Sequence, residues 1–186
     1  VDDAAEQAAA LQSQAQNVVR VGAIGGAISG LLSVALPLLA QQHPHLLVQL
    51  VEADAERLDQ MIARGDIDLA LCRAPRVVRE GWRFEPLLED RFAIVAAAGH
   101  PLASRRKLSL AQLRRETWLT LPSGSAARLA FDALFGNGGV LPPMCLVSSR
   151  VPSVLWAMLK ARPLLAMIPV SVARQLIDAG ELVELH

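Results

Sequence analysis

Two short loops of this chain carry residue types that bind small anions. The first lies in the stretch VGAIGGAISG, residues 21–30, where glycines separate a β-like run from an apolar helical pattern. Glycine lets another group approach the backbone closely, and the free N–H groups at the start of a helix bind anions. The candidates in this loop are Gly25, Gly26, Ala27 and Ser29. A tight turn with Ser29 as a helix cap is the alternative interpretation.

The second loop, Pro122-Ser123-Gly124-Ser125, follows the predicted strand Trp118–Leu121 and precedes a predicted helix. It combines hydroxyls, a glycine and a helix start, as the first loop does. Ser123 or Ser125 could simply cap that helix, and capping is compatible with contact to a ligand. Arg73 follows the third predicted strand and could pair with a carboxylate, although a solvated connector residue is an alternative interpretation.

Other kinds of chemistry find little support in the sequence. Glu52 ends the second predicted strand as a ribose-binding acid would, but the glycines run G-x-x-G-G-x-x-x-G and not G-x-G-x-x-G. His43 and His45 have no nearby Cys or acid that would complete a metal site, so we interpret them as surface residues. Ser123 has no recognisable His partner, and no pair of carboxylates stands out. We therefore predict no catalytic residue, no metal and no cofactor.

Composition limits the class of protein. The 186 residues include 18 basic and 18 acidic side chains, and 53% are hydrophobic. Binding nucleic acid through its phosphates requires an excess of basic side chains on one face of a protein. This charge-balanced chain is therefore not expected to bind nucleic acid by itself. Cys72 and Cys145 have no metal or redox spacing, which favours a reducing compartment. The acidic N-terminus lacks the basic region of a signal peptide, so we predict a cytoplasmic protein.

A membrane span has to be considered because residues 21–51 contain no Lys, Arg, Asp or Glu. The segment is interrupted by glycines, by Pro37 and by the polar run QQHPH at residues 41–45. It lacks an unbroken run of strongly apolar side chains long enough to span a bilayer. A strand, a turn and a buried helix explain the pattern better, and we predict no membrane contact.

The elements that position the first loop alternate between strand and helix. They are predicted as strands Val18–Ile24, Leu46–Val51 and Ile67–Cys72, with helices Leu31–Gln42 and Ala55–Arg64 between them. Because the first helix contains Pro37, we expect it to start late, capped by Ser33, or to bend. Short crossovers between such strands produce a parallel sheet.

An arginine- and proline-containing stretch, CRAPRVVREGWRFEP at residues 72–86, separates these elements from a second set. The second set is predicted, in chain order, as strand Phe92–Ala97, helix Leu110–Arg115, strand Trp118–Leu121, helix Ala127–Phe135, strand Met144–Val147, helix Val154–Lys160, strand Leu164–Ile168 and helix Ser171–Ala179. Two β/α lobes joined by a connector make a cleft between them the expected ligand site, because α/β sheets bind at the carboxyl ends of their strands.

Two long phrases resemble the effector-binding domain of LysR-type transcriptional regulators. They are VVRVGAIG…LLSVALPLLAQQHPHLLVQLVEADAERLDQMIARGDIDLALCR and FAIVAAAGHPLASRRKLSLAQLRRETWL. The resemblance covers residues 18–186 and implies an α/β fold of two lobes, in a type 2 periplasmic-binding-protein-like architecture with an inter-lobe cleft. The implied division is the end of a linker helix at 1–17, a first lobe at 18–73, a connector at 74–91 and a mainly second-lobe segment at 92–186.

The resemblance also implies a function. The domain would sense a small organic, anionic effector between its lobes and would form a homodimer or homotetramer. It would reach DNA only through an N-terminal helix-turn-helix domain that is absent here, and the segment that the family returns to the first lobe is expected to be missing after residue 186. Subunits would meet through helices Leu31–Gln42 and Ala127–Phe135. Family position adds further expected ligand contacts: Arg150, Val151 and Ser153.

Several alternatives stay open at this point. A solute-binding protein of a transport system would have the same lobes, although the Ala- and Gln-rich N-terminus argues against it. An enzyme on a two-lobed frame would need an acid–base set that the sequence does not show. A peroxide-sensing disulfide between Cys72 and Cys145 is disfavoured, because the two are predicted to lie in different lobes. Trp156 is interpreted as a core or interface residue.

Overall fold

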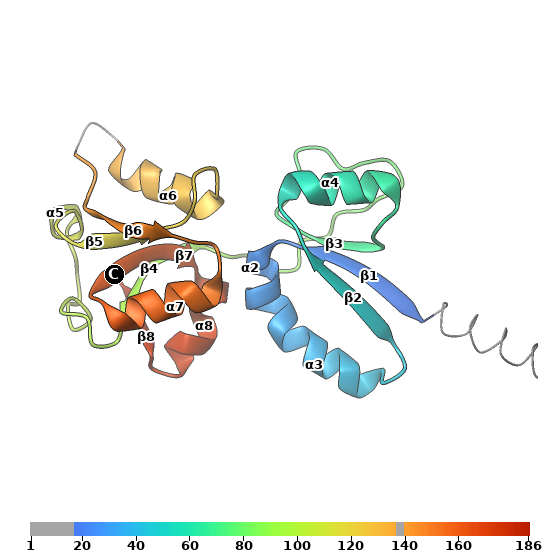
Figure 1. The fold of residues 1–186 in the computed structure, drawn as a ribbon, viewed down its shortest axis with the longest axis horizontal. Helices are drawn as coiled ribbons and strands as arrows, with labels where there is room; N and C mark the ends of the chain where they lie inside the picture. Colours follow the sequence, from blue (N-terminus) through green and yellow to red (C-terminus); the bar gives the residue numbers. More distant parts are fainter. Residues whose placement is uncertain (1–16, 137–139) are drawn as a thin grey trace, which may run out of the picture. The chain divides into compact units, whose positions relative to one another are not determined.

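The described part of the chain forms two β-sheets. The computed structural model describes residues 17–136 and 140–186. It separates into one unit that ends at Leu87 and another that begins at Leu88. Each unit holds one sheet flanked by helices (Figure 1). The predicted linker segment, residues 1–17, lies outside the described residues except for Asn17, which precedes the first strand.

The first unit is built on a three-stranded parallel sheet with the order β2-β1-β3. Its elements in chain order are β1 (Val18–Ala23), α2 (Gly25–Ala27), the π-helix η1 (Ile28–Leu32), α3 (Ser33–Gln42), β2 (Leu47–Glu52), α4 (Ala55–Arg64) and β3 (Leu69–Leu71). The strands are parallel because helical segments separate them and return the chain to the same edge of the sheet. The predicted parallel sheet is confirmed.

Apolar side chains cover both faces of this sheet. Val21 and Ala23 of β1 point to one face, where they pack with Leu32 of η1. Gly22 lies between them and faces the opposite side, because successive strand residues alternate. On that side Leu58 of α4 packs with Ile67 at the beginning of the β3 region. Figure 1 shows α3 and α4 on opposite sides of the three strands.

Local signals determine the ends of α4. The Asp54 carboxylate accepts a hydrogen bond from the Arg57 N–H at 3.0 Å, which caps the first turn. Gly65 ends the helix in the left-handed region with φ of 69°. The observed helix, Ala55–Arg64, is the one that the sequence predicts.

The helix after β1 begins earlier than predicted. It was expected at Leu31, but α2, η1 and α3 form one helical stretch, Gly25–Gln42, that runs through Pro37. The prediction that Ser33 caps its start is wrong, because the Ser33 hydroxyl donates to the Ser29 carbonyl at 2.7 Å inside the helix. The Ser33 N–H donates to the Ile28 carbonyl five residues earlier, which makes the π-turn.

The second unit is built on a five-stranded mixed sheet with the order β6-β5-β7-β4-β8. Its elements are β4 (Phe92–Ala97), α5 (Leu110–Leu113), β5 (Thr117–Thr120), α6 (Ala126–Phe135), β6 (Met144–Ser148), α7 (Pro152–Ala161), β7 (Leu164–Pro169), α8 (Val170–Asp178) and β8 (Leu182–Leu185). β5 pairs in parallel with β6 and β7, whereas β4 pairs antiparallel with β7 and β8.

Two apolar clusters cover the faces of the second sheet. On one face Leu119 packs with Leu155 and Leu159 of α7, and the partly buried Trp156 packs against this cluster. The interpretation of Trp156 as a core residue is therefore supported. On the other face Trp118 lies in edge contact with two rings of α6, at a centroid distance of 5.2 Å to each. These rings belong to Phe131 and Phe135.

The strand β8 is the element that sequence reasoning did not predict. It pairs antiparallel with β4, and Val95 lies opposite Glu184. Arg91 forms an ion pair with the Glu184 carboxylate, which lowers the pKa of that carboxyl because the paired anion is favoured. A four-residue strand with a central acid gives a weak alternating signal, so the sequence pattern alone did not distinguish it from a loop.

The connector is attached to both units by its ends. The Arg79 guanidinium donates two hydrogen bonds to the Asp59 carboxylate of α4, at 2.7 and 2.6 Å. At the other end the Asp90 carboxylate accepts from the Ser171 hydroxyl at 2.6 Å and from the Ser171 N–H at 3.2 Å, at the start of α8. Residues between these attachments form no helix or strand.

Candidate functional site

The three parallel strands of the first unit end at one edge of their sheet. Ala23 of β1 lies level with Glu52 of β2 and with Leu71 of β3. The loop that begins at Gly25 and the residue Arg73 both follow these strand ends, so the fold brings the predicted first-unit candidates to a common edge. Arg73 is exposed there, and Gly25, Gly26, Ala27 and Ser29 are partly buried.

Glu52 comes close to the first glycine of this loop. A Cβ built on Gly25 would lie 2.6 Å from Oε1 of Glu52. The glycine therefore provides room for a carboxylate of the same chain. Sequence reasoning considered Glu52 only as a ribose-binding acid and did not place it beside this loop. The available signal was its position as the last residue of the strand next to β1.

Ser29 does not cap the helix. Gly25 is the first residue of α2, so Ser29 lies in the second turn, within the π-helix. The alternative interpretation of Ser29 as a cap is wrong, because a cap must precede the first turn. The N-cap residue is Ile24, which offers no side-chain hydrogen bond.

In the second unit, Ser125 caps the helix that follows the second loop. Its hydroxyl accepts from the Arg128 N–H at 3.2 Å and donates to the Pro122 carbonyl at 2.8 Å. Gly124 adopts a left-handed conformation with φ of 79°, which lets the chain turn between Pro122 and Ser125. Ser123 is exposed. The capping interpretation is confirmed for Ser125 and wrong for Ser123.

The third predicted contact region follows β6. β5 and β6 are parallel neighbours, so the loop of residues 122–125 and the loop of residues 149–151 leave the same edge of the second sheet. The Val151 N–H donates to the Ser149 hydroxyl at 3.0 Å, and Pro152 begins α7. Three residues predicted as contacts from family position are exposed here: Arg150, Val151 and Ser153.

The pKa shifts of two titratable groups in the first unit arise from an ion pair and from burial. Asp68 accepts from both the side chain and the backbone N–H of Arg20, and this pairing lowers the pKa of the Asp68 carboxyl to about 2. Burial raises the pKa of the Cys72 thiol. Cys72 and Cys145 lie in different units, as predicted, and both are free thiols in the structure.

His100 is the buried imidazole of the second unit. It is 5% exposed, and its Nδ1 accepts from the Leu102 N–H at 3.1 Å. Its Nε2 has no hydrogen-bond partner among the described residues and lies 3.9 Å from Oε2 of Glu116. Burial lowers the pKa of His100, and the neighbouring Glu116 carboxylate opposes that effect.

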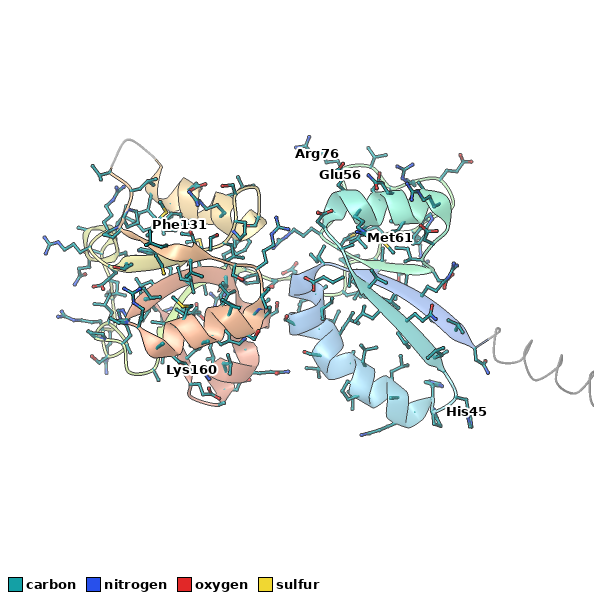
Figure 2. All side chains as sticks on the ribbon, viewed as in Figure 1. His45, Glu56, Met61, Arg76, Phe131 and Lys160 are labelled. Atoms are coloured by element: carbon teal, nitrogen blue, oxygen red, sulfur yellow. The ribbon has the colours of Figure 1, made fainter. Side chains whose placement is uncertain are left out.

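Metal ligation finds no support in the part of the chain that the structure describes. Over residues 17–136 and 140–186, no group of three or more His, Cys, Asp or Glu side chains could hold a metal ion. His43 and His45 are exposed, in agreement with their interpretation as surface residues, and Figure 2 shows His45 in the turn between α3 and β2.

The chain matches a known protein family over most of its length. A family model described as the LysR substrate binding domain matches residues 12–186. The chain belongs to this family. The predicted type 2 periplasmic-binding-protein-like α/β fold is confirmed by this match and by solved structures of LysR-type regulatory domains.

Curated LysR-type relatives are transcriptional regulators. The HTH-type transcriptional regulator GalR of Pseudomonas putida is 29% identical over 174 residues, which are 93% of this chain and 44% of the relative. The regulator CysL of Bacillus subtilis is 28% identical over 153 residues, 81% of this chain and 50% of the relative. The chain thus spans about half the length of these curated relatives. They are regulators and not enzymes, which supports the prediction of no catalytic function.

Solved structures share the fold of the LysR domain. The regulatory domain of CcmR from Synechocystis PCC6803, in complex with 2-PG, has a TM-score of 0.70 at 20% identity and covers 90% of this chain and 79% of that one. The reduced form of the OxyR regulatory domain from Pseudomonas aeruginosa has a TM-score of 0.68 at 19% identity, with 90% and 80% covered.

One helical stretch of the first unit is long and apolar enough to be a candidate membrane span. Gly25–Gln42 has the length and composition to cross a membrane, and little of it is buried. A single such helix near the N-terminus of a chain is weak evidence, and the relatives are transcription factors. The helix therefore does not indicate a membrane protein. The expectation of a buried helix is wrong, because Gly25–Gln42 runs through Pro37 and α3 has no buried residue.

Proposed function

We propose that this LysR domain binds a small organic effector between its two units. Effector binding would alter the DNA binding of domains elsewhere in the protein. The family match carries the proposal, since the LysR substrate binding domain model covers residues 12–186. The regulator would act in the cytoplasm as a homodimer or homotetramer. It would contact DNA only through an N-terminal helix-turn-helix domain.

The arrangement of the candidate residues supports an effector with an acidic group. In the second unit, the loops at residues 122–125 and 149–151 share one edge of the sheet and each leads into a helix. Their amide N–H groups, the Ser123 hydroxyl and the Arg150 guanidinium are donors that suit a carboxylate. From the first unit, Arg73 and the loop of residues 25–29 would complete the site, again at strand ends.

Binding would alter DNA contacts only through a preference for one state. A ligand shifts a conformational equilibrium by its difference in affinity for the two states, and equal affinity shifts nothing. The connector is attached to α4 by the Arg79–Asp59 pair and to α8 by Asp90. A change in the relation of the two units would therefore be taken up between these attachments.

Subunit contacts would use apolar side chains that helices expose. Val34 and Leu38 of α3 are 52% and 55% exposed, and Leu129 of α6 is 60% exposed. The family resemblance pairs these two helices between subunits. Burying such side chains removes apolar surface from water, which stabilises the assembly.

Thermal-shift screening with carboxylic acids tests the ligand site. We expect at least one acid to raise the melting temperature of the purified chain, and its effect to weaken in Ser123→Ala and in Arg73→Ala. Matched controls are Ser104→Ala and Arg76→Ala, since both side chains are exposed and lie outside the candidate loops (Arg76 is labelled in Figure 2). Unchanged affinity in both site variants would remove this site.

The oligomeric state separates the regulator from a transport protein with the same fold. Light scattering coupled to gel filtration at micromolar concentration should show a dimer or a larger assembly. Leu38→Glu on α3 should reduce it, because a charge would enter the proposed contact. A strict monomer would favour the solute-binding protein of a transport system.

A further inference from the structure

We infer that the helical stretch after β1 exchanges between two hydrogen-bonding registers, and that the Ser33 hydroxyl stabilises the register described here. The two registers present residues 25–29 in different orientations. The regulatory role of this exchange rests on the function proposed above, because these residues belong to the proposed effector site. The exchange itself lies within the first unit and can be observed without a ligand.

Ser33 makes a π-type bond with its backbone and an α-type bond with its side chain. Its N–H donates to the Ile28 carbonyl, five residues earlier. In an α-helix that N–H would donate to the carbonyl four residues earlier, which belongs to Ser29. The Ser29 carbonyl accepts instead from the Ser33 hydroxyl at 2.7 Å. The hydroxyl therefore occupies the acceptor that the Ser33 N–H needs in the α register.

Pro37 weakens the connection between the first turns and the rest of the helix. It has no N–H, so it cannot donate to the Ser33 carbonyl as another residue at this position of an α-helix would. Neither backbone group of Ser33 thus makes the bond that a regular α-helix gives it. The residues before Ser33 are therefore less firmly coupled to α3 than residues inside a regular helix are to one another.

Packing and composition leave room for a second register. Within residues 25–42, all of which the structure describes, Leu32 is the only buried residue. Removing the extra residue from the π-turn would turn the preceding residues by about 100° around the helix axis and move them about 1.5 Å along it. Gly25 and Gly26 can take up this change, because glycine adopts backbone conformations that other residues avoid.

The described register is the more populated one. Ala27, Ile28 and Leu31 contribute partly buried side chains to the apolar cluster on this face of the sheet. The Ser33 hydroxyl adds a hydrogen bond that the α register lacks. Losing one such bond changes an equilibrium about fivefold. The α register is therefore a minor state whose population depends on the Ser33 hydroxyl.

Exchange of this kind regulates the proposed effector site. The amide N–H groups of α2 (Gly25–Ala27) are the first of the helix, and their directions change with the register. A ligand that binds one register better shifts the equilibrium toward that register. The affinity of the site is then set in part by the fraction of molecules in the register that binds.

Nuclear magnetic resonance of the purified chain without ligand tests the exchange. We expect relaxation dispersion at the amides of residues 25–33 and not at those of residues 38–42. In Ser33→Ala the population of the minor state should rise about fivefold, because the hydroxyl bond is lost. Ser33→Thr should restore a population near that of the wild type, since threonine keeps a hydroxyl that can bond the same carbonyl.

Ser29→Ala is the matched control for this measurement. It changes helix propensity as Ser33→Ala does, but the bond uses the Ser29 carbonyl, which the substitution retains. The population should therefore stay near that of the wild type. A rise equal to that of Ser33→Ala would overturn the role of the Ser33 hydroxyl.

The chemical shifts of the minor state distinguish a second register from unfolding. Helical carbonyl shifts at Ile28 and Ser29 in the minor state support the α register, whereas random-coil shifts over residues 25–32 would overturn it. Absence of dispersion in both the wild type and Ser33→Ala, or equal minor-state populations in the two proteins, would also overturn the inference.

The carboxylic acid that gives the largest thermal shift in the screen described above separates this inference from the proposed function. We expect its addition to change the population of the minor state. An acid whose binding depends on Ser123 but leaves this population unchanged would overturn the regulatory role and keep the effector site. If no acid binds although the exchange depends on Ser33, the proposed function is rejected and the exchange stands.

Discussion

The packing of Gly22 against α4 gives the most quantitative prediction for the first unit. A Cβ at Gly22 would lie 2.6 Å from Cδ2 of Leu58 and 2.9 Å from Cδ1 of Ile67. Ordinary contact begins at 3.4 Å, so the first approach is short by 3.4 − 2.6 = 0.8 Å. Leu58 and Ile67 are 1% and 3% exposed, so neither side chain can turn into solvent. Gly22→Ala should therefore destabilise the unit by about 2 kcal/mol through overpacking.

A double-mutant cycle isolates the cause. Leu58→Ala removes Cδ2 and should itself cost about 3 kcal/mol through the cavity that it leaves. In that background Gly22→Ala should cost about 1 kcal/mol or less, because only the contact with Ile67 remains. Gln41→Ala on α3 is the control within the same unit, since Gln41 is exposed, and it should change the stability of the first unit by less than about 0.5 kcal/mol.

The measurement must report on the first unit alone. A chain of two units need not unfold in a single transition, so a global signal would mix them. Denaturant-dependent hydrogen exchange of a peptide that covers β1 (Val18–Ala23) avoids this problem. If Gly22→Ala left the exchange of this peptide unchanged, or cost as much in the Leu58→Ala background as alone, the packing of α4 on β1 would be refuted.

Three further changes concern pH and capping. Pairing with Arg20 holds the pKa of the Asp68 carboxyl at about 2, below its unfolded value of 3.8, so the pair stabilises the first unit above pH 3.8 and this stabilisation is lost as the pH falls toward 2. In Asp68→Asn the stability of the first unit, measured by hydrogen exchange of the β1 peptide, should fall less steeply with decreasing pH. An unchanged pH dependence would contradict this. Burial lowers the pKa of His100 below 6.5, so the second unit should lose stability as the pH falls through about 6.5. In His100→Asn the difference between the urea unfolding midpoints at about pH 7 and about pH 5 should be smaller than in the wild type. An equal difference would exclude His100 as the source of the pH dependence. Ser125→Ala should lower stability by about 1 kcal/mol in urea unfolding, whereas Ser123→Ala serves as its control; equal losses would contradict the assignment of the cap.

Features that depend on neighbours along the chain could be predicted from the sequence. The helix Ala55–Arg64 is one case, because its cap at Asp54 and its end at Gly65 are local signals. The parallel order of the first three strands is another, because crossover chirality and short loops leave few arrangements. The candidate loop at residues 122–125 was also identified, with its serine cap at Ser125.

Features that depend on contacts across the fold could not be predicted in this way. The start of the first helix was placed too late, since the pattern gave weight to Pro37 and the π-turn at Ile28–Leu32 has no sequence signal of its own. The strand β8 is recognisable only as the partner of β4, far earlier in the chain. Its central Glu184 is compensated by Arg91, a pairing that only the fold creates.

The sequence by itself determined the family, the alternation of strands and helices, and the loops with small and hydroxyl residues, because each is encoded in residues close together along the chain. The tertiary structure alone decided that Glu52 lies beside Gly25. That contact depends on the pairing of β1 with β2, and strand register is set by packing over the whole sheet.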